Sequence, residues 1–365
     1  MQLVSLAPPP DLTIPEPGST TARDVLSRAV GRLMQELRPT LRAHAASAPG
    51  DVAAMDRALA GVPVGALASV LRRPHVGGLL RTLRGTPLGE GGALLAELLA
   101  TLSFDLVHMG ALARPVPLSR GPARVVSLVA RTVTPWPAGP TEHPFHVVER
   151  DTVLALADNN PLASVEAHPD KEGNAIDLGG HPVSEWVDIL RAAFALVEEV
   201  LPDLRAEMAH YVQAIVPVGF FEERHLSASY REAIGTLYLS LHPHPMTMVE
   251  ALIHEFQHNK LNALLELDDV LENAHEPLYP SPVRPDPRPL HGVLLAVHAF
   301  VPVTRLYERM IERGDPRAGE SRFRDIVRIN REGTEVLRQH ARATPVGAGL
   351  LAELVRWDEH YARVT

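Results

Sequence analysis

The sequence contains no cysteine. This absence excludes disulfide bonds, thiolate metal sites, iron–sulfur clusters and cysteine nucleophiles. A metal site in this protein therefore has to use other ligands, such as imidazole or carboxylate groups.

Targeting and membrane signals are lacking as well. Residues 1–5 have no basic start, and no apolar run of about 7–15 residues ending in small residues follows them, so we expect no signal peptide. No stretch of about 20 apolar residues is free of charges and prolines, so we expect no membrane-spanning helix. We therefore expect a cytoplasmic protein without a membrane partner.

A basic patch is also missing. The net charge is −9, and lysine and arginine residues are scattered along the chain. Proteins that track a nucleic-acid backbone usually carry clustered basic residues. We therefore expect no nucleic-acid partner.

The chain has 365 residues, enough for about two domains. Its patterns predict an α+β fold that is mainly α-helical. The expected parts are an N-terminal helical layer, a small mixed or antiparallel sheet, and a C-terminal helical region with the metal motif. We place an N-terminal helical region at 1–115, a β-rich segment at 116–183 and a metal-binding catalytic region at 184–365.

Hydrophobic periodicity predicts the individual elements. Residues 1–20 hold five prolines and predict an extended arm. Apolar residues at spacings of three and four predict helices from Thr21 and from Ser184, and over about 290–313, 322–340 and 347–363. Short β-branched runs predict strands at 125–129, 147–148, 153–156, 212–218 and 233–239.

One predicted helix carries the motif His-Glu-x-x-His, at residues 254–258. Thr247 and Glu250 match a capping box that would begin this helix just before the motif. His254 and His258 then lie one turn apart on one face, where two imidazoles can bind one divalent metal. Glu255 lies next to them, within reach of a metal-bound water or of a ligand. The alternative is a pair of surface histidines without a metal.

A third protein ligand is needed to complete such a site. The extended zinc-peptidase pattern is excluded, because Leu261 and Leu264 stand where it has glycine and histidine. His291 and His298 are seven residues apart on one predicted helix, so they share a face. We favour His298, a polar ring on an apolar stripe that needs a partner. His291 is the alternative ligand.

Cationic residues near the motif are candidates for binding a carboxylate ligand. Arg284 and Arg288 lie in a segment stiffened by alternating prolines, and a rigidly held arginine can bind a carboxylate bidentately. Lys260 can serve the same role, and Asn262 adds a polar group to the motif helix. The alternative for these arginines is a surface ion pair with Asp286.

Three segments together resemble a known family. They are the run 250–264, the Arg-Pro-rich run 284–290 and the run 297–300, and they resemble the α-ketoglutarate HExxH-type peptide β-hydroxylases. The resemblance is strong over about 245–305 and diffuse elsewhere. It implies Fe(II) as the metal and α-ketoglutarate (2-oxoglutarate) as cosubstrate. It also implies hydroxylation of a side-chain β-carbon in a ribosomally synthesised precursor peptide.

The resemblance further implies residue roles. His254 and His258 would be iron ligands, and Arg288 or Arg284 would bind the far carboxylate of the cosubstrate. Glu255 would then support the site rather than act as a base. The main alternative is a zinc metallopeptidase, in which Glu255 is the general base on a zinc-bound water. A third possibility is a non-catalytic accessory protein that binds a peptide and has lost its metal.

Overall fold

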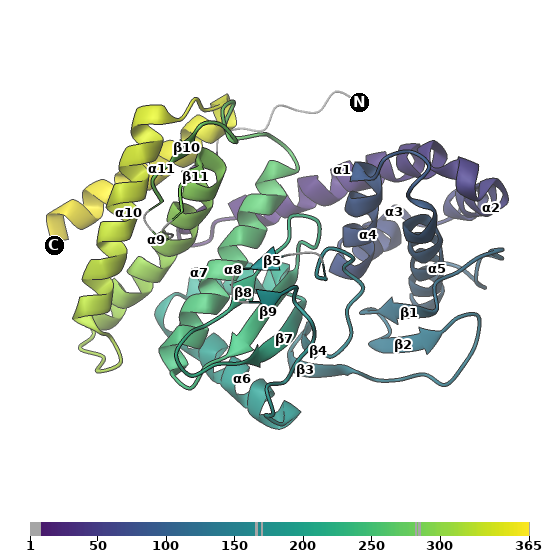
Figure 1. Ribbon diagram of the computed structural model, residues 1–365, viewed down its shortest axis with the longest axis horizontal. Coiled ribbons are helices and arrows are strands. Elements are labelled where there is room, and N and C mark those ends of the chain that lie inside the picture. Colours follow the sequence, from purple (N-terminus) through teal and green to yellow (C-terminus); the bar gives the residue numbers. More distant parts are fainter. Residues whose placement is uncertain (1–8, 165–166, 169–170, 282, 284–285, 365) are drawn as a thin grey trace. The chain divides into compact units, whose positions relative to one another are not determined.

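The computed structural model describes residues 9–164, 167–168, 171–281, 283 and 286–364. The chain forms two compact units, and each is assembled from separate stretches of sequence (Figure 1). Unit 1 comprises Met1–Ala29, Ile189–Tyr211 and His242–Thr365, and unit 2 comprises Val30–Asp188 and Val212–Leu241. The three consecutive ranges predicted from the sequence group residues by element type, whereas the compact units are discontinuous.

Unit 2 contains a five-stranded mixed sheet with strand order β3-β4-β7-β9-β8. The strands are β3 (Phe145–Glu149), β4 (Thr152–Ala155), β7 (Ala214–Phe220), β8 (Ser227–Ala228) and β9 (Thr236–Leu241). The central strands β4, β7 and β9 pair in parallel, and β3 and β8 are antiparallel edges. β9 is buried along its whole length, as expected for a strand of a parallel sheet that is covered on both faces. The predicted small mixed sheet is thus confirmed.

The rest of unit 2 is mostly helical. Its elements are the latter part of α1 (Thr21–Ala43), η1 (Ala45–Ser47), α2 (Pro49–Leu59), α3 (Val64–Leu71), α4 (Pro74–Gly85), α5 (Gly92–His108), β1 (Arg124–Ser127), β2 (Thr132–Pro135), β5 (Ala167–His168), β6 (Lys171–Glu172) and the start of α6 (Val183–Val200). The leucines of α1 to α5 form one buried apolar cluster. The predicted N-terminal helical layer is therefore present.

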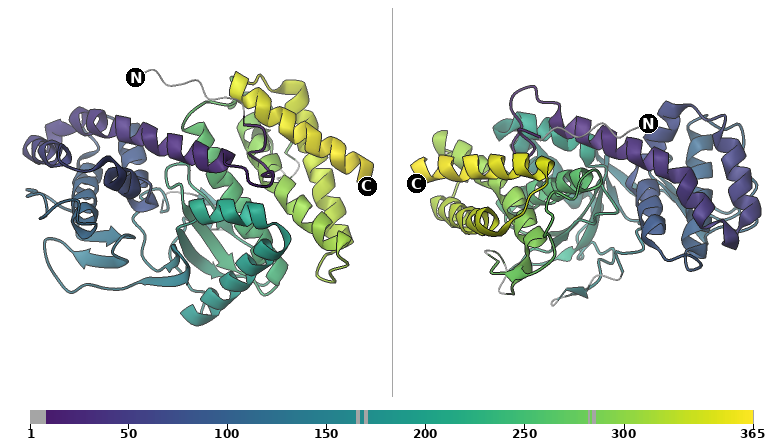
Figure 2. Two further views of the ribbon diagram at one scale, coloured as in Figure 1. Left: turned by 180° about the vertical axis from the view of Figure 1, so that it is seen from behind. Right: turned by 90° about the horizontal axis from the view of Figure 1, so that it is seen from above.

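Unit 1 is a helical assembly that contains the metal motif. Its elements are the end of α6, α7 (Pro202–Tyr211), α8 (Pro245–Leu265), β10 (Leu278–Tyr279), β11 (Arg288–Pro289), α9 (Leu290–Glu312), α10 (Glu320–His340) and α11 (Pro345–Val364). Helices α9, α10 and α11 lie side by side, and α8 packs against α9 (Figures 1 and 2). The predicted α+β, mainly helical fold class is confirmed.

Helix α9 is the one helix among the described residues whose length and composition would suit a membrane span. Its apolar window is 72% buried within the protein. Burial of this kind is what a core helix shows, because neighbouring helices cover its apolar sides.

The N-terminal arm packs closely on unit 1. Leu12 and Thr13 are fully buried. The amide groups of Thr13 and Ile14 donate to the Glu353 carboxylate of α11, and Gln257 Nε2 of α8 donates to the Thr13 carbonyl at 2.8 Å. The described part of the arm has no regular secondary structure, in line with the prediction, and its backbone is satisfied by side chains of two helices.

Candidate metal centre

Helix α8 begins differently from the prediction. It starts at Pro245, with His244 at the N-cap and no side-chain cap hydrogen bond, so the predicted capping box of Thr247 and Glu250 is wrong. Proline at the first position suits a helix start because its missing N–H has no partner there anyway. Glu250 is free for a longer-range role: it accepts from Tyr307 Oη at 2.7 Å and pairs with Arg322.

The helix is almost completely buried, and its few accessible positions form one line. From Met246 to Leu265, the residues that are not buried are Thr247, Glu250, His254 and His258. Their spacings of three and four place them on a single face. We call these four positions the accessible line of α8. Both motif histidines therefore lie on the part of α8 that solvent or a ligand can reach.

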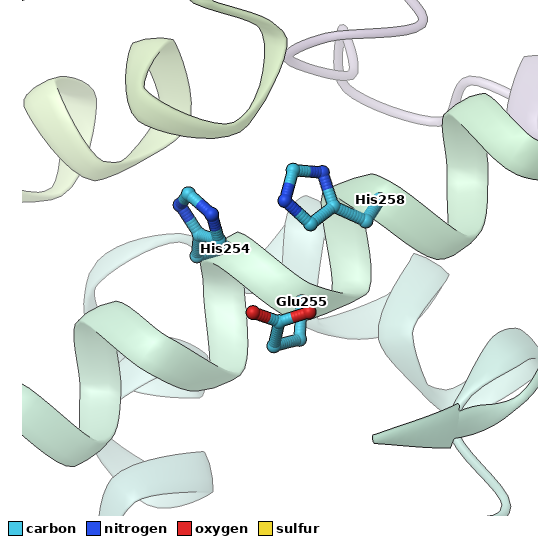
Figure 3. Close-up of side chains that lie close together, drawn as sticks. All are labelled: His254, Glu255 and His258. Atoms are coloured by element: carbon cyan, nitrogen blue, oxygen red, sulfur yellow. The ribbon is translucent and has the colours of Figure 1, made fainter. Parts of the chain in front are cut away.

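The two motif imidazoles lie next to each other. Their ring centroids are 4.4 Å apart and the ring planes meet at 78°. In Figure 3 both rings lie above the α8 ribbon, and the Glu255 carboxylate is drawn below them. One ligating atom from each of His254, Glu255 and His258 lies within 4.8 Å of the other two. Phe300 of α9 packs edge-on against His254, with centroids 4.8 Å apart, and so restrains that ring.

Glu255 is held inside the protein. Its exposed fraction is 2%, and its backbone carbonyl accepts from Asn259 Nδ2 at 2.9 Å. A buried carboxylate this close to two imidazoles can accept a proton from a ligand at the site or hydrogen-bond to an imidazole N–H.

His298 of α9 is fully buried, and neither of its ring nitrogens has a hydrogen-bond partner among the described residues. The Nδ1 atom of His258 likewise has none within that part of the chain. A buried polar atom without a partner costs free energy, and such an atom calls for a ligand or a water. The donor set of buried imidazole nitrogens therefore fits a metal ion, although His298 is not in the 4.8 Å group.

The protonation states also fit metal binding. Burial, together with nearby His291, lowers the pKa of His258 to about 4. Burial lowers the pKa of His298 well below its usual range, and Lys260 and His258 lower it further. Both rings are therefore neutral near pH 7, and the neutral imidazole is the form that binds metals.

His291, the alternative third ligand, lies in the first turn of α9. Its amide donates to the Ala274 carbonyl at 2.8 Å, and its ring centroid is 5.6 Å from that of His275. Its positive form would disfavour protonation of His258 and so contributes to the lowered pKa of that ring. Both predicted α9 histidines thus interact electrostatically with His258.

The residues predicted to bind a carboxylate lie in different parts of the structure. Arg288 lies in β11, half-exposed, with its Nε 3.0 Å from Asp286 Oδ2, which is the surface pair considered as the alternative. Arg284 lies outside the described residues. Lys260 is fully buried, with Nζ 2.5 Å from Glu207 Oε2 of α7. Asn262 is buried one turn beyond His258.

Sequence reasoning missed Glu207, Tyr307 and Arg322. Tyr307 is seven residues after Phe300 on α9, a spacing that places both on the face toward α8, so periodicity could have found it. Glu207 is 53 residues from its partner Lys260 in the sequence, and Arg322 is 72 residues from its partner Glu250. No local sequence pattern indicates pairs that far apart.

Comparisons with known proteins add no assignment: no family model matches the chain, and no curated protein matches it.

Proposed function

We propose that this protein is an Fe(II)/α-ketoglutarate-dependent dioxygenase, located in the cytoplasm, that hydroxylates a side-chain β-carbon in a ribosomally synthesised precursor peptide. One observation carries the proposal. Two neighbouring imidazoles occupy the accessible line of a buried helix, and α9, which packs against that helix, carries a third, buried imidazole whose ring nitrogens have no hydrogen-bond partner among the described residues. The resemblance of residues 245–305 to the peptide β-hydroxylases supplies the metal and the cosubstrate.

The residues would act as follows. His254 and His258 hold the metal with His298, or with His291 in its place. Three protein ligands leave positions open for small molecules, as non-haem iron oxygenases require. Bound iron(II) supplies the activation of dioxygen that is coupled to oxidation of the cosubstrate. Phe300 packs edge-on against the His254 ring and so restrains its orientation.

A zinc metallopeptidase is the second candidate. It is favoured by the Glu255 carboxylate, which lies within 4.8 Å of ligating atoms of both histidines. A carboxylate at that place can take a proton from a water that attacks a peptide bond. Glu255→Gln separates the two functions, because it should abolish peptidase turnover and should leave a hydroxylase part of its activity.

The test begins with metal content. Protein purified without chelators should hold about one metal ion per chain. His254→Ala and His258→Ala should lose it, and His244→Ala, an exposed histidine at the start of the same helix, should retain it. Equal metal content in all variants would exclude this site.

The second measurement is turnover. Iron-loaded protein should release succinate from α-ketoglutarate and add one oxygen atom, about 16 Da, to a candidate precursor peptide, as read by mass spectrometry. Peptide cleavage without α-ketoglutarate would instead establish the peptidase.

A further inference from the structure

The accessible line of α8 continues past the two histidines to an ion pair. Glu250 lies four residues before His254, which is about 6 Å along the helix axis. Its carboxylate binds the Arg322 guanidinium of α10 through two contacts, Nε to Oε1 at 3.1 Å and Nη2 to Oε2 at 2.5 Å. The line therefore has two imidazoles toward one end and, toward the other, a carboxylate that binds an arginine of α10.

This arginine is firmly placed. Tyr307 Oη donates to Glu250 Oε1 at 2.7 Å, so the carboxylate that holds Arg322 is itself fixed by α9. Tyr307 and Phe300 are seven residues apart on α9 and contact Glu250 and His254 respectively. The same two helices thus orient both the arginine and the nearest candidate ligand.

One side of the guanidinium is still available. Arginine offers five N–H groups, and a bidentate pair on Nε and Nη2 uses only one edge of the fork. No second hydrogen-bonded partner of this guanidinium occurs in the part of the chain that the structure describes, and the Arg322 side chain is 42% exposed. A second carboxylate can bind the remaining edge, formed by Nη1 and the outer N–H of Nη2.

Other cations near the motif are less suited to that role. Lys260 is fully buried against Glu207, and Arg288 is paired with Asp286 on a half-exposed strand. Of these three cations, Arg322 alone is paired with a residue of the accessible line, Glu250.

We propose that Arg322 is a carboxylate-binding residue of the candidate metal centre, held in place by Glu250 and Tyr307. This rests on the proposed function for the identity of the ligand, which is either the cosubstrate or an acidic side chain of the peptide. α-Ketoglutarate is a dicarboxylate, so it can bind the metal through one end and present its other carboxylate to the guanidinium.

The experiment measures binding by isothermal titration calorimetry of metal-loaded protein. The probes are α-ketoglutarate and N-acetyl-aspartate amide, a model of an acidic peptide side chain. Arg322→Met should weaken the Kd of one of them about 10- to 100-fold, as the loss of a charge-assisted bidentate pair predicts. Arg322→Lys, which keeps the charge and loses the fork, should show an intermediate loss.

Arg328→Met is the matched control. Arg328 is an exposed arginine of the same helix, paired with Glu332 at 3.0 Å, and its replacement should leave both Kd values unchanged. A loss confined to α-ketoglutarate assigns Arg322 to the cosubstrate, and a loss confined to the aspartate probe assigns it to the peptide. Either result supports the proposal.

Unchanged binding of both probes in folded Arg322→Met and Arg322→Lys overturns it, as does a wild-type protein that binds neither probe. Because titration needs no turnover, the two proposals can fail separately. Arginine-dependent binding without succinate release would refute the hydroxylase assignment and keep the carboxylate site. Succinate release by the wild type, together with an unchanged Kd in Arg322→Met, would support the hydroxylase assignment and refute the carboxylate site.

Discussion

The buried ion pair between Lys260 and Glu207 offers the sharpest test of how the motif helix is held. Lys260 follows the second motif histidine by two residues, and its side chain is completely buried. Its Nζ lies 2.5 Å from Glu207 Oε2, and Glu207 is itself 6% exposed. The perturbation is Glu207→Gln, which leaves the ammonium group in the interior without its counter-ion.

The magnitude follows from the burial of both partners. Removing one member of a buried pair costs about 3–5 kcal/mol, because the remaining charge stays desolvated without compensation. Replacing both members by apolar side chains of similar size, as in Lys260→Met with Glu207→Leu, removes that charge too and should cost clearly less. Glu332→Gln, which breaks an exposed pair with Arg328, should cost at most about 1 kcal/mol.

The assay is urea unfolding followed by circular dichroism, compared at equal m-values. A Glu207→Gln variant within about 0.5 kcal/mol of the wild type would refute the reasoning, since it would mean that the Lys260 charge is hydrated or paired elsewhere. The double variant also tests the predicted role of Lys260 in binding the cosubstrate. If it folds and still binds α-ketoglutarate, Lys260 supports the helix and does not contact the ligand.

Three further predictions concern stability and are read from the same unfolding curves. Burial raises the pKa of Glu353 from 4.5 to about 7, so between these pH values the folded protein binds more protons than the unfolded chain. The free energy of unfolding should therefore fall by a few kcal/mol as pH rises from about 4.5 to about 7. Glu353→Gln should make the free energy of unfolding less dependent on pH in this range. Ser127→Ala removes the 2.5 Å hydrogen bond to the fully buried Asp105 carboxylate and should cost about 1–3 kcal/mol; no loss would mean that water replaces the hydroxyl. Gly347→Ala would place a Cβ 1.9 Å from the Val270 carbonyl and should cost at least about 1–3 kcal/mol, whereas an unchanged midpoint would show that α11 shifts freely.

Local patterns were sufficient for most of the fold. The helices from Leu290 onward repeat apolar residues with a helical period, and the structure confirms each of them within about two residues at either end, the usual uncertainty of helix boundaries. Four of the short β-branched runs are strands of the mixed sheet, and the run at 125–129 is β1 of a separate two-stranded sheet. The central strands could be recognised because a strand buried on both faces needs apolar residues on both.

The capping box shows where local reasoning fails. Thr247 and Glu250 have the right spacing, but Pro245 begins the helix two residues earlier and Glu250 contacts residues 57 and 72 positions away. A sequence pattern shows which hydrogen bonds a side chain could form with its near neighbours in the chain. It does not show whether residues of other helices will be the preferred partners.

The sequence by itself determined that two imidazoles stand one turn apart on a helix, because the spacing of four residues sets that geometry wherever the helix lies. Only the tertiary structure decided which side of α8 stays accessible, that His298 is buried with its ring nitrogens lacking partners among the described residues, and that Lys260 and Arg322 find carboxylates on α7 and α8. Those features depend on helices packed together from distant parts of the chain, and packing, unlike helical periodicity, is not encoded at short range.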